Sequence, residues 1–183
     1  MGTMLTQFAK LSNFEVITTC SAHNVELCKS FGADHVFDHK DESSIDNIRA
    51  LVGDSLRLCV DTISADDGST AAFCAKVLSP GAKYSNIRIG KSPRHDVESM
   101  NTVGYSFYGE GWEFMGQPQK VSKVDYEYSR GFAILAEKLL AEAKIKPHPV
   151  DLRSGGFEAL PSLLDELKAG KVSGKKLVVR LSE

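Results

Sequence analysis

The chain has 183 residues, of which 42% are hydrophobic and 25% are charged, and its formal net charge is −2. This composition is typical of one globular domain with enough apolar residues for a core, and the near-neutral charge gives no reason to expect nucleic acid or an anionic membrane as a partner. No apolar run approaches the roughly 20 residues of a membrane span, and no basic segment followed by an apolar core predicts a secretory signal.

Helices and strands alternate along the first half of the chain, which is typical of a parallel sheet in an α/β protein. Helices are expected where apolar residues recur at helical spacing, namely in Met4–Leu11, Val25–Phe31, Ile45–Val52 and Ala71–Leu78. Strands are expected at Phe14–Thr19, His35–Asp38, Leu56–Asp61 and Ala82–Ile87.

The second half is predicted to begin with a polar loop at Arg88–Met100 and a strand at Thr102–Tyr108. Apolar residues from Phe132 to Ala143 predict the longest helix. Residues Pro147–Leu152 are predicted to be extended, and Lys175–Leu181 to form a final strand. Between them, Leu160–Leu167 is predicted to be a helix with Pro161 in its first turn and with its leucines facing the core.

Cysteine and histidine spacing gives no indication of a metal site. The four cysteines are scattered among apolar neighbours without a C-x-x-C pair, and the five histidines lack ligand spacing. We expect reduced thiols in a cytoplasmic protein with no bound metal. No nucleophile with a paired base is recognisable either, so the catalytic residues stay unknown.

The segment Thr18–Asn24 carries the clearest functional signal, because an apolar strand ends there in neutral hydrogen-bonding residues. In a dinucleotide-binding fold an acid at this place accepts from the ribose 2′-hydroxyl of NAD, whereas NADP needs that acid replaced by donors. The first acid after the strand is Glu26, already inside the next helix. The pattern therefore favours a 2′-phosphate and hence NADPH.

Four runs together resemble medium-chain dehydrogenases/reductases, and within them the zinc-independent fungal enoyl reductases that act in trans on polyketide synthases. The runs are Thr18–Asn24, Lys29–Asp38, Gly104–Glu110 and Gly170–Leu177. The resemblance covers nearly the whole chain but only the C-terminal half or so of a family member.

The resemblance implies a Rossmann-like, doubly wound, mostly parallel sheet that lacks its first strand. Residues 1–183 are then a single, truncated NADP-binding domain whose last helix and strand return toward an absent catalytic domain. Because strand 1 lies centrally in the order 3-2-1-4-5-6, its loss exposes backbone groups of the two flanking strands, which either stay unpaired or pair directly. We expect a marginally stable chain with negligible activity alone.

The resemblance also assigns cofactor-binding residues. Around the adenosine these are Ser21, Ala22, His23 and Asn24 at the 2′-phosphate, His39 at the adenine, and Gly2 and Thr3 at the pyrophosphate. The alternatives are helix capping for Ser21, an exposed first turn for His23 and Asn24, and simple solvent exposure for His39.

Further along the chain the family pattern places Asn86 and Ile87 at the nicotinamide and Val172 and Ser173 in a turn that returns to the cofactor. A plain exit from a strand is the alternative for Asn86 and Ile87. The family pattern assigns a substrate-lining segment to Phe107, Tyr108, Gly109, Glu110 and Gly111.

The implied function is an NADPH-dependent oxidoreductase of enoyl-reductase type, present as its cofactor-binding part. It transfers hydride to the β-carbon of an α,β-unsaturated acyl thioester. Its expected partners are a small-molecule or carrier-bound acyl substrate and a polyketide synthase. The alternatives are a non-catalytic nucleotide- or partner-binding remnant and, less favoured, part of a zinc alcohol dehydrogenase.

Overall fold

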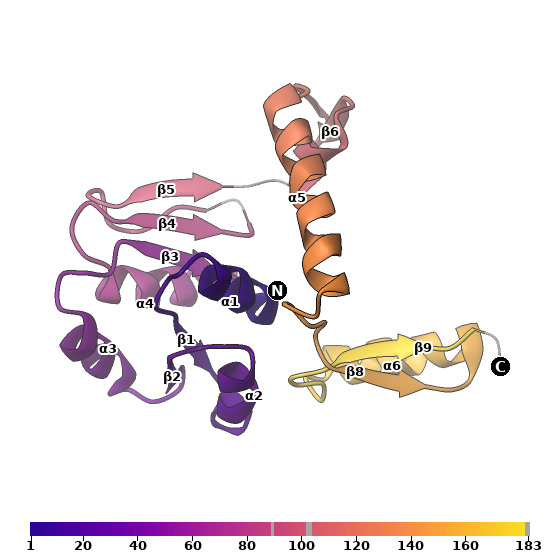
Figure 1. The fold of residues 1–183 in the computed structure, drawn as a ribbon, viewed down its shortest axis with the longest axis horizontal. Helices are drawn as coiled ribbons and strands as arrows, with labels where there is room; N and C mark the ends of the chain where they lie inside the picture. The colour runs from indigo at the N-terminus through magenta and orange to yellow at the C-terminus, as the bar shows by residue number, and fades with distance from the viewer. Residues whose placement is uncertain (89, 102–103, 182–183) are drawn as a thin grey trace. The chain divides into compact units, whose positions relative to one another are not determined.

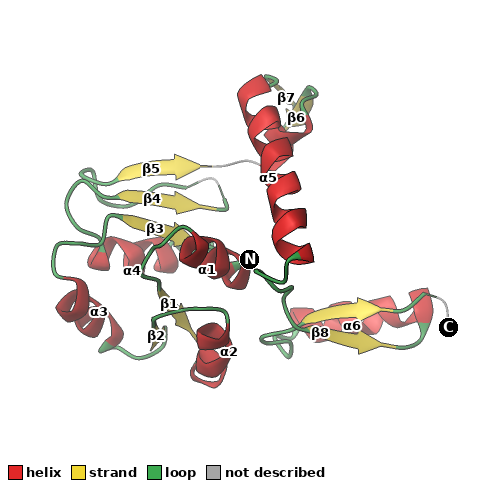
Figure 2. Ribbon diagram, in the orientation of Figure 1, coloured by secondary structure: helices red, strands yellow, loops and turns green. Residues whose placement is uncertain are grey.

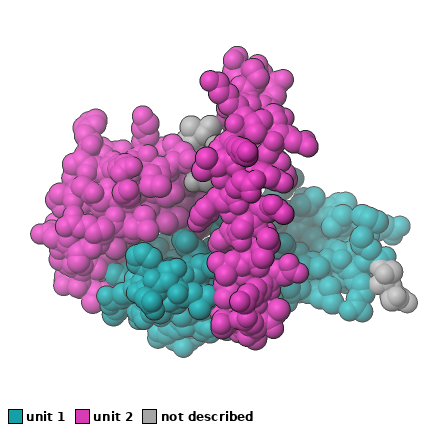
Figure 3. Space-filling view, turned by 45° about the horizontal axis from the view of Figure 1, so that its top comes forward, with its two compact units in different colours: residues 1–41, 145–183 teal, residues 42–144 magenta. Residues whose placement is uncertain are grey.

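In the computed structural model, which describes residues 1–88, 90–101 and 104–181, helices alternate with mostly parallel strands (Figures 1 and 2). This confirms the α/β prediction. The chain forms two compact units, which are residues 1–41 with 145–183 and residues 42–144 (Figure 3). Each unit is described by itself below.

The first unit begins with helix α1 (Gly2–Leu11) and a short parallel pair of strands. Strand β1 (Ile17–Cys20) pairs with β2 (His35–Asp38) in the register Ile17↔His35 to Cys20↔Asp38. The 3-10 helix η1 (Ala22–Asn24) and helix α2 (Val25–Ser30) connect them. The predicted order of helix and strand in this part of the chain is confirmed.

The C-terminal part of this unit is a second parallel pair, β8 (Val150–Arg153) with β9 (Lys176–Val179). Between them lie η3 (Gly156–Ala159) and helix α6 (Leu160–Lys168), with Pro161 in its first turn as predicted. The expectation that the leucines of α6 face the core is wrong, because Leu164 and Leu167 are both more than half exposed. Helical spacing predicts an apolar face but does not supply a covering surface.

Polar contacts join α1 to the segment that leads into β8. The buried Gln7 donates from Nε2 to the Lys146 carbonyl over 3.0 Å and accepts from the Lys146 N–H at Oε1 over 2.8 Å. The Thr3 hydroxyl lies 3.2 Å from His148 Nδ1. These contacts hold two segments that are about 140 residues apart in sequence.

The second unit contains a three-stranded parallel sheet in the order β3-β4-β5. Its elements are α3 (Ser44–Val52), β3 (Leu58–Asp61), α4 (Ser69–Val77), β4 (Lys83–Asn86) and β5 (Glu98–Asn101). The core is formed by Leu78, Ala82, Tyr84 and Val97.

Two predictions for residues 88–108 are wrong. The loop expected at Arg88–Met100 ends in β5, because the backbone of Glu98–Asn101 pairs with Lys83–Asn86 and completes the sheet. Of the strand expected at Thr102–Tyr108, Thr102 and Val103 lie outside the described residues, and the rest is the 3-10 helix η2 (Gly104–Tyr108).

The antiparallel hairpin that follows η2 was not predicted from the sequence. Strand β6 (Trp112–Phe114) pairs with β7 (Gln117–Gln119) through a two-residue turn, Met115-Gly116. Both turn residues have positive φ, 50° and 74°, as the tight turns of hairpins require. Methionine is an unusual residue for such a position, and this explains why the turn was not recognised.

The longest helix is α5 (Lys123–Ala141), and the predicted element is confirmed. Its first turn is capped by the Ser122 hydroxyl, which accepts from the Asp125 N–H over 3.1 Å. No described residue of α5 is buried, so its apolar positions are not part of the core. The predicted apolar face ended at Ala143, but the helix stops before this residue, whose φ is +53°.

Candidate functional site

The loop after β1 brings the predicted 2′-phosphate residues against the predicted C-terminal turn. His23 Nε2 lies 2.7 Å from the Ser173 Oγ, and Asn24 Nδ2 donates to the same oxygen over 2.9 Å. Val172 is the half-buried neighbour of Ser173. Two segments proposed separately as cofactor contacts therefore lie side by side in the same unit.

This contact depends on a glycine at position 174. A Cβ built there would lie 2.6 Å from Asn24 Oδ1 and 3.0 Å from Leu27 Cδ2, and the φ of Gly174 is +66°. Both the close approach and the left-handed backbone require glycine. The Val-Ser-Gly turn of residues 172–174 is thus fitted tightly against the loop after β1.

Ser21 precedes η1 with an extended backbone (φ −72°, ψ 146°), and its side chain makes no capping hydrogen bond. The capping alternative is therefore not observed, and Ala22 simply begins η1 in an exposed position. The acid that follows, Glu26, is 84% exposed and pairs with Lys29 at 2.9 Å. The end of β1 and the loop that follows it, residues 17–24, contain neutral donors and no carboxylate, and the carboxylate at this edge is that of Asp38, which pairs in register with Cys20.

His39 follows β2 in an exposed position at the same edge of the sheet. Its backbone N–H donates to the Cys20 carbonyl over 3.1 Å, and its Nδ1 lies 3.7 Å from Asp38 Oδ1. The backbone contact fixes the loop after β2 to the end of β1. The ring itself is about half exposed, so its assignment to the adenine stays a prediction.

Gly2 and Thr3 form the first turn of α1, where backbone N–H groups lack helical partners and favour an anion. Thr3 is tied by its hydroxyl to His148. Burial, followed by nearby positive charge including that of Lys176, lowers the pKa of His148. At neutral pH the ring is therefore uncharged, and its Nδ1 accepts from the Thr3 hydroxyl when the proton is on Nε2.

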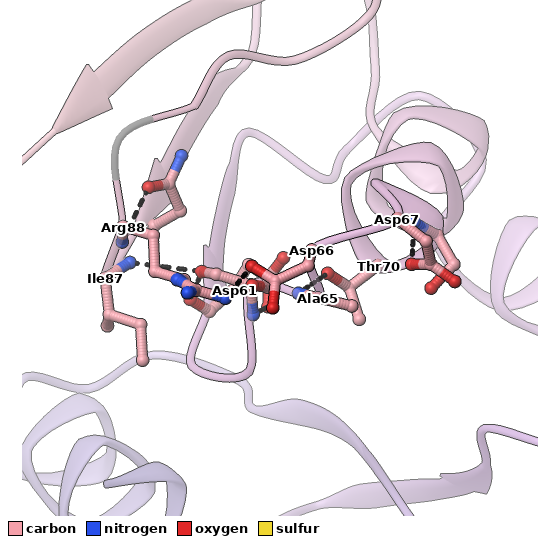
Figure 4. Close-up of polar contacts among 10 residues, drawn as sticks. Asp61, Ala65, Asp66, Asp67, Thr70, Ile87 and Arg88 are labelled. Carbon is pink, nitrogen blue, oxygen red and sulfur yellow. Dashed lines mark hydrogen bonds and ion pairs between the residues drawn. The ribbon is translucent and has the colours of Figure 1, made fainter.

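In the second unit, the predicted residues Asn86 and Ile87 lie at the carboxyl end of β4, beside the end of β3 (Figure 4). Asn86 is buried; its Nδ2 donates to the Gly90 carbonyl and its Oδ1 accepts from the Arg88 N–H, both over 3.0 Å. The Ile87 N–H donates to Ser64 Oγ over 3.3 Å, and the Ile87 side chain is 40% exposed. Internal hydrogen bonds therefore hold both residues, and their assignment to the nicotinamide stays a prediction.

Sequence reasoning missed Asp61, which is the centre of the polar contacts at this edge. Its register partner is Asn86, and both residues are buried. Arg88 also joins this edge, by an ion pair with Asp66 and a 3.4 Å contact from Nη1 to the Ser64 carbonyl (Figure 4). An acid as the last residue of a strand, with a tyrosine in the next strand, was the available signal.

The predicted substrate-lining residues begin in the last two residues of η2, Phe107 and Tyr108, and continue beyond it to Gly111. Phe107 is 37% exposed and Tyr108 is 72% exposed. The neighbouring Glu110 and Gly111 are exposed as well. Gly109 packs against the Tyr126 ring so closely that a Cβ would lie 2.7 Å from it. The Phe107 carbonyl accepts from the Ser129 hydroxyl over 3.3 Å. The segment is thus fixed to α5, and its substrate role stays a prediction.

The described ranges also show whether side chains gather into a metal site and whether a helix could cross a membrane. No group of three or more histidine, cysteine, aspartate or glutamate residues there is placed to hold a metal ion. All four cysteines are free thiols. None of the described helices has both the length and the apolar composition needed to cross a membrane.

Comparison with known proteins places this arrangement in a family. A family profile described as zinc-binding dehydrogenase matches residues 1–105. The trans-enoyl reductase ACTTS2 of Alternaria alternata is 39% identical over 181 residues, which is 98% of this chain and 52% of the relative. The trans-enoyl reductase FSL5 of Gibberella zeae is 36% identical over 190 residues, covering 100% of this chain and 52% of the relative. The chain spans about half the length of these relatives.

Solved structures share the fold. CurA of Vibrio vulnificus, solved in complex with NADPH, matches with a TM-score of 0.68 at 18% identity over 100% of this chain and 54% of that one. A probable oxidoreductase from Mycobacterium abscessus matches with a TM-score of 0.69 at 22% identity, over 97% of this chain and 50% of that one. With its Rossmann-like elements and a profile match over more than half its length, the chain belongs to the zinc-binding dehydrogenase family of the medium-chain dehydrogenase/reductase superfamily.

Proposed function

We propose that this chain carries the NADPH-binding part of an enoyl reductase. The observation that supports this most directly is the contact of His23 and Asn24 with Ser173 at the end of β1, where a carboxylate selective for NAD is absent. Neutral hydrogen-bond donors suit a phosphate on the ribose and leave no like charge to repel it. The relatives that carry the name trans-enoyl reductase supply the reaction class.

Under this proposal the chain binds and orients the cofactor, and the bound cofactor supplies the hydride. The first turn of α1, with Gly2 and Thr3, would hold the pyrophosphate through backbone N–H groups. Asn86 and Ile87 would contact the nicotinamide at the carboxyl end of β4. The substrate would be an α,β-unsaturated acyl thioester delivered by a polyketide synthase, as expected for a protein similar to these relatives.

The proposal is tested with a ligand pair that differs only in the 2′-phosphate. Adenosine 2′,5′-bisphosphate should bind at least about tenfold more tightly than 5′-AMP in calorimetric titrations, since each hydrogen bond to a charged group is worth about 1.5–3 kcal/mol. Ser21→Asp should abolish this preference by placing a negative charge at the end of β1. Ser162→Ala, which removes an exposed hydroxyl on α6, is the matched control and should change nothing.

The outcomes separate the candidate functions. Equal affinity for the two nucleotides would overturn the NADPH assignment. Selective binding without consumption of NADPH in the presence of a crotonyl thioester would support the nucleotide-binding, non-catalytic alternative for the chain by itself. Selective binding together with turnover would support the reductase directly.

A further inference from the structure

The carboxylate of Asp61 is buried and its hydrogen-bonding capacity is used at both oxygens. Oδ1 accepts from the backbone N–H groups of Ile63 and Ser64 over 3.0 and 2.7 Å. Oδ2 accepts from the Tyr84 hydroxyl over 3.0 Å, and Tyr84 is only 2% exposed. A buried carboxylate is tolerated where its oxygens are satisfied in this way, and it then fixes its donors rigidly.

Ionisation of Asp61 follows from the same contacts. Burial by itself raises the pKa of this carboxyl, but hydrogen bonds from Thr70, Ser64, Ile63 and Tyr84 outweigh the burial and lower it. The group is therefore a carboxylate at neutral pH, and its hydrogen bonds are of the stronger, charge-assisted kind.

Ser64 is held in a backbone conformation that it would not adopt freely. Its φ is +51°, in the left-handed region that costs a residue with a side chain about 1 kcal/mol. Ser64 is also buried, and its hydroxyl donates to the Asp61 carbonyl over 3.1 Å. The two hydrogen bonds to Asp61 Oδ1 are the contacts that keep this turn in place.

The turn reaches the next strand through the Ser64 hydroxyl. The Ile87 N–H donates to Ser64 Oγ over 3.3 Å, so the position of the Ile87 backbone depends on Ser64 and, through it, on Asp61 (Figure 4). The side chains of Ile63 and Ile87 are left 71% and 40% exposed. One carboxylate thus fixes the loops after both β3 and β4, each of which presents an apolar side chain to solvent.

These loops border a cavity of about 220 Å³ lined by Asp61, Ser64, Thr70, Tyr84, Asn86 and Arg88. Cavities for whole ligands usually have volumes of roughly 300–1,000 Å³. The size of this cavity therefore suits one ring-sized end of an extended ligand. On the proposed function, that end is the nicotinamide.

We propose that Asp61 is a positioning residue for the nicotinamide end of the cofactor, acting through the backbone of Ser64 and Ile87. This inference rests on the proposed function. Both oxygens of Asp61 are occupied by hydrogen bonds from Ile63, Ser64 and Tyr84, so Asp61 acts by setting the geometry of the loops after β3 and β4. Changing it should therefore weaken the contribution of the nicotinamide and leave adenosine recognition, which depends on His23, Asn24 and Ser173, unchanged.

The experiment compares two ligands on the full chain. NADPH carries the nicotinamide, and adenosine 2′,5′-bisphosphate does not. Asp61→Asn should weaken NADPH binding about tenfold, as expected for loss of one charge-assisted hydrogen bond, and should abolish the change in nicotinamide fluorescence on binding. The affinity for the bisphosphate should stay within about twofold. Asp67→Asn, the same substitution at an exposed site whose Oδ1 accepts from the Ser69 N–H, is the control.

Ser64→Gly provides a second variant if Asp61→Asn does not fold. It accepts the positive φ without strain but removes the hydroxyl that anchors Ile87, so it should also weaken NADPH selectively. Unchanged NADPH affinity and fluorescence in either folded variant would overturn the proposal, as would an equal loss of affinity for both ligands. If the unaltered chain binds neither ligand, the proposed function fails together with this inference; if it binds the bisphosphate no less tightly than NADPH, only this inference fails.

Discussion

Replacing Gly174 by alanine tests whether the close fit of residues 172–174 against the loop after β1 builds the adenosine site. The new Cβ would lie 2.6 Å from Asn24 Oδ1, so the Asn24 side chain has to move and its hydrogen bond to Ser173 is lost. Gly170→Ala provides a control with a matching backbone conformation. Its φ of +67° matches the +66° of Gly174, but a Cβ there would meet nothing within 4 Å.

The structure gives the expected magnitudes. Both substitutions incur the cost of a left-handed alanine, about 1 kcal/mol. Gly174→Ala adds the loss of one hydrogen bond, about another 1 kcal/mol. We therefore expect the free energy of unfolding to fall by about 1 kcal/mol for Gly170→Ala and by about 2 kcal/mol for Gly174→Ala.

Urea unfolding followed by circular dichroism measures the difference in stability between the two variants. Titration with adenosine 2′,5′-bisphosphate measures the difference in affinity. Only Gly174→Ala should bind this ligand more weakly than the unaltered chain, by about fivefold, the equivalent of about 1 kcal/mol. If the two variants lose the same stability and retain the same affinity, the contact between Asn24 and the turn does not contribute to the site.

Three further predictions concern stability and metal content. Gln7→Ala should lower the free energy of unfolding by about 2 kcal/mol, because it removes two hydrogen bonds to the Lys146 backbone, whereas the exposed Gln117→Ala should have no measurable effect in the same urea titration. The folded-state pKa of Asp61 lies below its ordinary value of 3.8, so its stabilising contribution is present above that value and is lost as the pH falls through the folded pKa. Thermal melts from neutral to acidic pH should therefore show a steeper loss for the unaltered chain than for Asp61→Asn. Elemental analysis should find no stoichiometric zinc despite the family's name; one tightly held equivalent per chain would contradict the prediction.

The elements that were predictable from sequence are those with a local cause. The strand His35–Asp38 was predicted with its observed bounds, because the apolar pair Val36-Phe37 directly after the turn residues at 32–34 favours a strand. The Met115-Gly116 turn has no such local signature, and β5 is recognisable only by its pairing with β4. The apolar spacing in α5 and α6 predicted the helices correctly, but not whether anything covers them.

The residues of the candidate site likewise differ in whether a local sequence pattern predicts them. The neutral residues after β1 were visible as a local pattern, whereas the role of Asp61 depends on a cross-strand relation. Tyr84 reaches Asp61 because Cys59 pairs with Tyr84 and Asp61 with Asn86. A tyrosine two register pairs before the end of its strand becomes informative only once the register is known. No reading of either strand alone predicts that the two side chains meet.

The contact of His23 and Asn24 with Ser173 has its cause outside the site. It closes a loop of 150 residues, for which the entropic cost is roughly 4 kcal/mol, while hydrogen bonds between neutral groups contribute about 1 kcal/mol each. The contact cannot hold the two segments together by itself. Other contacts also hold the C-terminal part of the chain to the N-terminal part: the two hydrogen bonds between Gln7 and Lys146, the hydrogen bond between Thr3 and His148, and the packing of the Lys146 ammonium 4.6 Å from the centre of the Phe31 ring. The geometry at the proposed 2′-phosphate site therefore follows from how the C-terminal segment packs on α1 and α2, and the selectivity for NADPH should be lost whenever that packing is loosened.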